Sequence, residues 1–96
     1  MFYEKTVNSF PRLMQEADLL DLDGGIRSYV TYNGRKSFVF VTRSPNGFTL
    51  MVYGRRVHGS KEAAGRRLLV EEFETTAELK RFIEGILARP VKAFVY

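Results

Sequence analysis

Asn33 and Gly34 form the feature that most restricts how this chain can fold. Both residue types tolerate positive φ angles, and an Asn-Gly pair favours a two-residue type I′ turn between antiparallel strands. On either side lie runs rich in β-branched and aromatic residues, at positions 26–32 and 35–43. We therefore predict a hairpin in which Tyr32 lies opposite Arg35, and this pair sets the register of all the others.

That register sorts the side chains of the hairpin onto two faces of a sheet, because successive residues of a strand point to opposite sides. One face is aliphatic or small and suits packing beneath helices: Ile26, Ser28, Val30, Val39 and Val41. The other face mixes aromatic and basic side chains: Arg27, Tyr29, Thr31, Lys36, Phe38 and Phe40. Aromatic rings beside cations are the chemistry of base stacking next to phosphate neutralisation.

A second turn, at residues 44–47, leaves open which of these faces is the core. Pro45 is suited to the first corner of that turn, and Gly47 is available for a bulge before a third strand at residues 48–53. With a bulge there, Leu50 and Val52 would join the aromatic face. Phe38, Phe40, Leu50 and Val52 would then be an ordinary core rather than a binding surface.

Helices are predicted at both ends of this sheet. Apolar residues recur at helical spacing between Ser9 and Leu22, with Ser9 as the N-cap and Pro11 in the first turn. A second helix begins after the capping box from Thr75 to Glu78 and ends before Pro90. Residues 91–96 follow as an edge strand. The expected fold is one α+β domain over residues 1–96, an antiparallel sheet of four to five strands with the N-terminal and C-terminal helices on one face.

Positive charge is concentrated in the middle of the chain. Residues 24–70 hold nine basic residues and one acidic residue, whereas the remainder holds six basic and ten acidic residues. Within this stretch we predict a long basic loop at residues 54–66 and a fourth strand at residues 67–74. Such a one-sided field is typical of proteins that bind a polyanion, although folding could also place acids beside these cations. The candidate site residues in this segment are Tyr53, Arg55, Arg56, His58, Lys61, Arg66 and Arg67.

Catalytic and metal chemistry find little support in the composition. The chain has no cysteine and one histidine, His58, which excludes a thiolate site and a two-histidine site. Asp21 and Asp23 resemble the opening of a calcium loop, but the later oxygen ligands do not follow. We expect no enzyme activity and no cofactor. No apolar run approaches the roughly 20 residues of a membrane span and no signal peptide precedes the domain, so a soluble cytoplasmic protein is expected.

Two resemblances follow from these residues. The order of elements, the basic-aromatic sheet and the terminal amphipathic helix resemble the archaeal ThermoDBP-related single-stranded DNA-binding proteins, and the arginine-rich composition with one Gln and three Asn suits a thermophile. That resemblance implies a cleft with basic residues on its rim and Tyr29, Phe38, Phe40 and Tyr53 as stacking residues. Locally, Tyr53-Gly54-Arg55 is similar to the WGR domain, with Tyr in place of the tryptophan, and implies binding to duplex ends or nicks.

The sequence thus predicts a domain that binds single-stranded DNA or RNA through a basic groove and aromatic stacking. DNA and RNA both fit, because phosphate contacts and stacking serve either. The alternatives are a WGR-like duplex-end binder and a protein-interaction module that self-associates through its second sheet face or its C-terminal edge strand. We expect a homodimer with no membrane partner, although the composition itself does not fix the oligomeric state.

Overall fold

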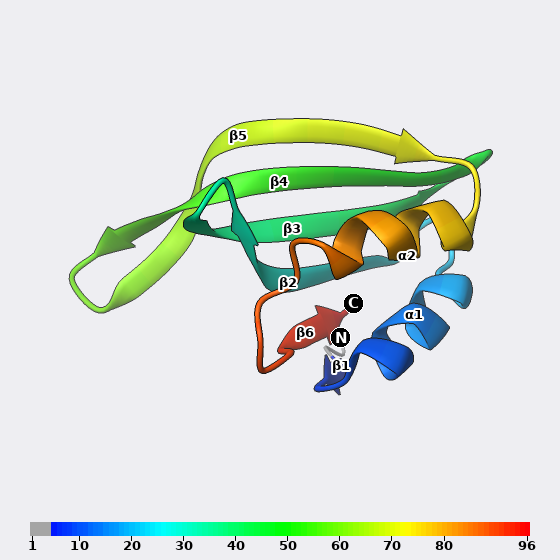
Figure 1. The fold of residues 1–96 in the computed structure, drawn as a ribbon, viewed down its shortest axis with the longest axis horizontal. Helices are drawn as coiled ribbons and strands as arrows, with labels where there is room; N and C mark the ends of the chain where they lie inside the picture. The colour runs from blue at the N-terminus through cyan, green and yellow to red at the C-terminus, as the bar shows by residue number, and fades with distance from the viewer. Residues whose placement is uncertain (1–4) are drawn as a thin grey trace.

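The protein folds as a six-stranded antiparallel sheet with two helices on one side (Figure 1). The computed structural model describes residues 5–96, apart from the side chains of residues 57, 58 and 62. The elements are β1 (Lys5–Val7), α1 (Phe10–Asp18), β2 (Gly25–Tyr32), β3 (Arg35–Ser44), β4 (Gly47–His58), β5 (Lys61–Phe73), α2 (Thr76–Glu84) and β6 (Ala93–Val95). The strand order across the sheet is β1-β6-β2-β3-β4-β5. The α+β class is confirmed, with more strands than the four to five predicted.

The hairpin around Asn33 and Gly34 is confirmed in its turn and its register. Asn33 has a φ of 52° and Gly34 a φ of 75°, as a type I′ turn requires. Tyr32 pairs with Arg35, and the pairing continues without a shift to Gly25 and Thr42 at the far end of β2. A two-residue local signal therefore fixed the positions of the aromatic and aliphatic side chains over eight residue pairs.

The structure has no bulge after the second turn, so the alternative that placed Leu50 and Val52 on the aromatic face is wrong. Ser44 pairs with Gly47, so the turn contains two residues and adds no extra one to the strand. Leu50 consequently pairs with Val41 and lies on the aliphatic face. Val52 lies on the same face, and neither residue joins the aromatic side of the sheet.

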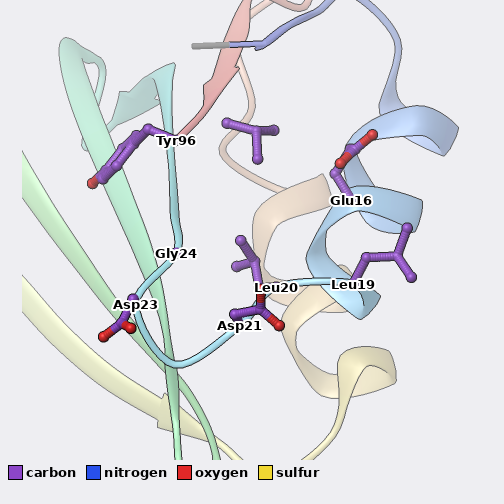
Figure 2. Close-up of a pocket in the computed structure, with 8 residues that line it drawn as sticks. Glu16, Leu19, Leu20, Asp21, Asp23, Gly24 and Tyr96 are labelled. Carbon is purple, nitrogen blue, oxygen red and sulfur yellow. The ribbon is translucent and has the colours of Figure 1, made fainter. Parts of the chain in front are cut away.

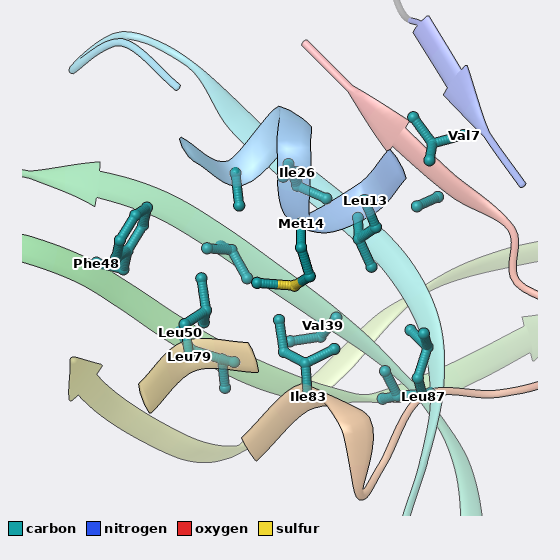
Figure 3. Close-up of a cluster of buried hydrophobic side chains, with 14 of the residues drawn as sticks. Val7, Leu13, Met14, Ile26, Val39, Phe48, Leu50, Leu79, Ile83 and Leu87 are labelled. Carbon is teal, nitrogen blue, oxygen red and sulfur yellow. The ribbon is translucent and has the colours of Figure 1, made fainter. Parts of the chain in front are cut away.

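The aliphatic face is the core, and both helices pack on it (Figure 3). Val39, Leu50 and Phe48 form its floor, with Leu13 of α1 and Leu79 of α2 above them. All five are at most 2% exposed. Each such side chain contributes roughly 1.5–3 kcal/mol of transfer free energy. This burial holds the helices on one face of the sheet and directs the other face outward.

Capping residues start both helices where the sequence places them. The Ser9 hydroxyl accepts a hydrogen bond from the Arg12 backbone N–H at 3.4 Å, and the Thr75 hydroxyl accepts one from Glu78 N–H at 3.2 Å. The first helix ends at Asp18 rather than at residue 22. Leu19 and Leu22 are exposed, so a further turn would bury little apolar surface.

Two segments differ from the prediction. Residues 54–66 are the far half of the β4–β5 hairpin and not a loop, since Arg56 pairs with Ala63 on the way to a tight turn at Gly59. The C-terminal strand β6 is not at an edge but between β1 and β2, because Val95 pairs with both Lys5 and Ile26. In this fold β6 therefore offers no free edge to a second copy, as both of its sides are already paired.

Candidate nucleic-acid interface

The face of the sheet turned away from the helices carries the predicted aromatic and basic side chains. We call it the open face. Pairing places the side chains on it in rows that cross the strands, because directly opposed residues share a face. Its members are Arg27, Tyr29, Thr31, Lys36, Phe38, Phe40, Met51, Tyr53 and Phe94. The aromatic residues among them are half-buried, which leaves part of each ring accessible to a ligand.

Four rings occupy the middle of the open face as two contacting pairs. Tyr29 and Phe38 lie directly opposite each other, with ring centroids 5.3 Å apart and planes tilted by 48°. Phe40 and Tyr53 have centroids 5.4 Å apart in an edge-to-face arrangement at 87°. The Tyr53 hydroxyl also lies 3.7 Å from the Met51 sulfur. These contacts hold the rings in fixed orientations, which lowers the entropic cost of stacking a base on them.

A guanidinium group is packed among these rings. The Cζ atom of Arg55 lies 5.1 Å from the Tyr29 centroid and 5.5 Å from the Phe38 centroid, within the range of a cation–π contact. Arg55 is half-buried, whereas its neighbour Arg56 is exposed. A planar guanidinium so held can bind a phosphate in a fork or stack on a base. Arg55 is thus the predicted site residue that joins the aromatic and the basic parts of the surface.

Phe94 and Lys92 belong to this face but were missed by the sequence analysis. Phe94 pairs with Arg27 of β2, and the Arg27 Cζ atom lies 4.9 Å from the Phe94 ring centroid. The Lys92 ammonium lies 5.9 Å from the ring centroids of both Phe94 and Tyr29. Val91 and Ala93 alternate along the chain with Lys92 and Phe94, and this alternation of apolar core residues indicates that Lys92 and Phe94 share the opposite face. An edge position for residues 91–96 separates them from the hairpin, which is why the sequence does not connect these two side chains with Tyr29.

A basic arm extends the sheet beyond its helix-covered part. We use this name for residues 54–66, the far half of the β4–β5 hairpin, which projects past both helices (Figure 1). Arg56, Lys61 and Arg66 are exposed on it, and Arg67 follows at its base, paired with Tyr53. The predicted site residue His58 lies near its tip, and its side chain is outside the described part of the structure. The basic arm therefore extends the sheet from one end of the open face.

A positively charged pocket lies where the arm meets the β2–β3 hairpin. Its volume is about 350 Å³. Five cations line it: Arg35, Lys36, Arg55, Arg56 and Arg66. None of its described lining residues is acidic. Gly54 and Gly65 form part of the wall, and an added Cβ at Gly65 would lie 3.1 Å from the Arg56 side chain. Such a concentration of positive charge is suited to holding a phosphate group.

A second pocket, at the opposite end of the molecule, is acidic (Figure 2). Glu16, Asp21 and Asp23 contribute to its wall, in a volume of about 340 Å³. The carboxylates of Asp21 and Asp23 point away from one another (Figure 2). Among the described residues, no group of three acidic or histidine side chains is arranged to hold a metal ion. Acidic and basic pockets thus lie far apart on the surface.

Comparison of the chain with family models, curated proteins and solved structures finds no match. No helix in the described part of the chain is long and apolar enough to span a membrane.

Proposed function

We propose that the protein binds single-stranded nucleic acid across the open face and the basic arm, with little preference for sequence. The observation that carries the proposal is the position of the four rings. Tyr29, Phe38, Phe40 and Tyr53 lie on the face that the helices leave open, and cations lie among them. Half-buried aromatic rings expose apolar surface to water, and every base offers a flat face that can stack on them.

The charge distribution supports a phosphate path next to the rings. Arg55 contacts the aromatic cluster and also lines the positively charged pocket, so it links the two parts. From there Arg56 and Lys61 continue along the arm. Five phosphate contacts, made by Arg55, Arg56, Lys61, Arg66 and Arg67, would give a slope of log K against log salt of roughly −3 to −4.

Single strands suit this surface better than duplexes do. Unstacked bases can lie flat on aromatic side chains, whereas the bases of a duplex are already stacked on each other and accessible only at the ends. DNA and RNA strands both offer phosphates and free base faces. The segment that resembles a WGR domain, Tyr53-Gly54-Arg55, lies inside β4 and leads into the arm, so duplex ends remain the rival ligand.

The proposal is tested by fluorescence anisotropy with labelled single-stranded DNA, single-stranded RNA and duplex DNA of equal length, across a salt series. The decisive variant is Tyr29→Ala, and Tyr32→Ala is its matched control. Both tyrosines belong to β2, but Tyr32 pairs with Arg35 on the helix side of the sheet and packs against the core. Circular dichroism establishes that each variant remains folded.

Tyr29→Ala is expected to weaken single-strand binding by about 5- to 150-fold, the loss of one stacked base at about 1–3 kcal/mol. Tyr32→Ala should leave the affinity unchanged. An equal loss in both folded variants would remove the open face from the site. A preference for duplexes would favour the WGR-like alternative, and absence of binding at low salt would refute nucleic-acid binding altogether.

A further inference from the structure

The outer strand β5 leaves one long edge of the sheet available for pairing. It is the last strand in the sheet order and spans thirteen residues, Lys61–Phe73, paired with β4 along one side. Unpaired backbone donors and acceptors on such an edge can pair with another strand. Near its middle, the aliphatic residues Leu68 and Val70 are 43% and 44% exposed. This edge therefore offers both backbone groups and apolar surface to a partner.

Charges of opposite sign flank the apolar residues of this strand. Arg66 and Arg67 precede the apolar residues 68–70, and Glu71 and Glu72 follow them. All four charged side chains are exposed, and no ion pair joins them to another described side chain. At about 3.3 Å per residue, Arg67 and Glu71 are roughly 13 Å apart along the strand, too far to neutralise each other. The strand is basic at one end and acidic at the other.

We propose that β5 pairs with β5 of a second copy of this chain in an antiparallel, two-fold symmetric dimer. With Leu69 at the symmetry axis, an antiparallel partner runs in the opposite direction, so its acidic end lies beside the basic end of the first copy. Arg66 and Arg67 of each copy then lie alongside Glu71 and Glu72 of the other. Leu68 and Val70 lie opposite each other and become buried. This is an isologous interface, in which one surface is its own partner.

The irregularity of β5 reduces this complementarity but does not remove it. Its pairing with β4 shifts register between Val52 and Tyr53 and again between Tyr53 and Arg55, so the strand contains bulges near residues 65–68. A bulge displaces the opposed residues by one position. Because each end of the segment carries two neighbouring charges of the same sign, a displacement by one residue still leaves one pair of opposite charges, Arg66 and Glu71, beside each other at each end.

A second copy explains the pattern better than another partner or an isolated edge does. Proteins often place charged residues on edge strands to prevent pairing, and charges of one sign throughout would repel every copy. Here the two signs are segregated to opposite ends, which attracts a copy that runs antiparallel and repels one that runs parallel. A foreign strand would have to carry the reverse pattern, whereas β5 supplies it itself.

The oligomeric state tests the proposal, measured by sedimentation velocity at several protein concentrations without nucleic acid. Two charge-reversed variants are compared with the wild type: Arg66→Glu/Arg67→Glu, which is acidic at both ends, and Glu71→Arg/Glu72→Arg, which is basic at both ends. Asp21→Arg/Asp23→Arg lies in an exposed loop at the other end of the molecule, makes the same change in charge as Glu71→Arg/Glu72→Arg, and serves as the control.

The wild type and the control are expected to dimerise, whereas each β5 variant alone should raise the dimer dissociation constant at least about tenfold. An equimolar mixture of the two β5 variants should restore dimers, because every opposed pair is again of opposite sign. A monomeric wild type would overturn the proposal and mean that the charges protect the edge. Dimers that survive in both variants, or a mixture that stays monomeric although both proteins are folded, would overturn it as well. None of these outcomes depends on nucleic-acid binding.

Discussion

Arg55 and Arg56 are neighbours in β4, but replacement by Ala is expected to lower the free energy of unfolding only at Arg55. Arg55 is half-buried and has its guanidinium group over two rings, at 5.1 Å from Tyr29 and 5.5 Å from Phe38. A cation–π contact contributes about 0.5–1 kcal/mol at an exposed site and up to about 2 kcal/mol when desolvated. Loss of two such contacts should lower the free energy of unfolding by about 1–2 kcal/mol. Arg56 is exposed, and Arg56→Ala should change it by less than about 0.5 kcal/mol.

Urea denaturation followed by circular dichroism measures the difference. For a domain of this size 1 kcal/mol corresponds to about 4–8 °C in Tm, so a thermal melt gives an independent value. Both variants lose one positive charge, and in the single-strand salt series each slope should fall by about 0.7 if the arginine contacts a phosphate. Equal stabilities of the two variants would refute the expectation that the contacts of Arg55 with Tyr29 and Phe38 stabilise the fold. Arg55→Met, which keeps the apolar stem, distinguishes loss of charge from loss of packing.

Two further predictions concern the stability of the scaffold. Gly47→Ala should lower the free energy of unfolding by at least about 2–3 kcal/mol in urea denaturation, because its Cβ would lie 2.0 Å from the Phe73 carbonyl oxygen. Gly34 has open space around it, so Gly34→Ala should cost only the roughly 1–2 kcal/mol of a left-handed backbone. Thr75→Ala removes the hydroxyl that accepts from the Glu78 N–H and should cost about 1 kcal/mol, and a variant as stable as the wild type would show that this cap does not contribute.

Features encoded by neighbouring residues could be predicted from the sequence. The turn at Asn33 and Gly34 determined a register of eight pairs, and Ser9 and Thr75 marked the starts of the two helices. Each of these signals acts within a few residues of its consequence. The two strands of the basic arm could not be recognised from the sequence, because their arginines, alanines and glycines do not alternate between polar and apolar as the residues of half-buried strands do.

Features that depend on contacts between distant segments could not be predicted. β1 has three residues and gives no periodic signal, and it is held by its pairing with β6 at the other end of the chain. Lys92 reaches the Tyr29 ring only because β6 pairs with β2. The contact of Arg55 with Tyr29 likewise requires β3 and β4 to lie side by side in the observed register. The residue types of the site were visible in the sequence, but their assembly on one face depended on the order of the strands.

The two proposals assign different partners to Arg66 and Arg67, phosphate groups in one case and carboxylates of a second copy in the other. In a dimer joined through β5 these residues lie beside Glu71 and Glu72 of the second copy, and they are then poor ligands for phosphate. Only Arg55, Arg56 and Lys61 would remain, and at about 0.7 per contact the salt slope for a single strand would be near −2 instead of near −3.5. Salt also screens the interface charges, so the dimer should weaken in the same range of ionic strength and release the two arginines. A slope that is shallow at low salt and steeper at high salt, together with loss of the dimer, would mean that self-association and strand binding compete for the same pair of arginines.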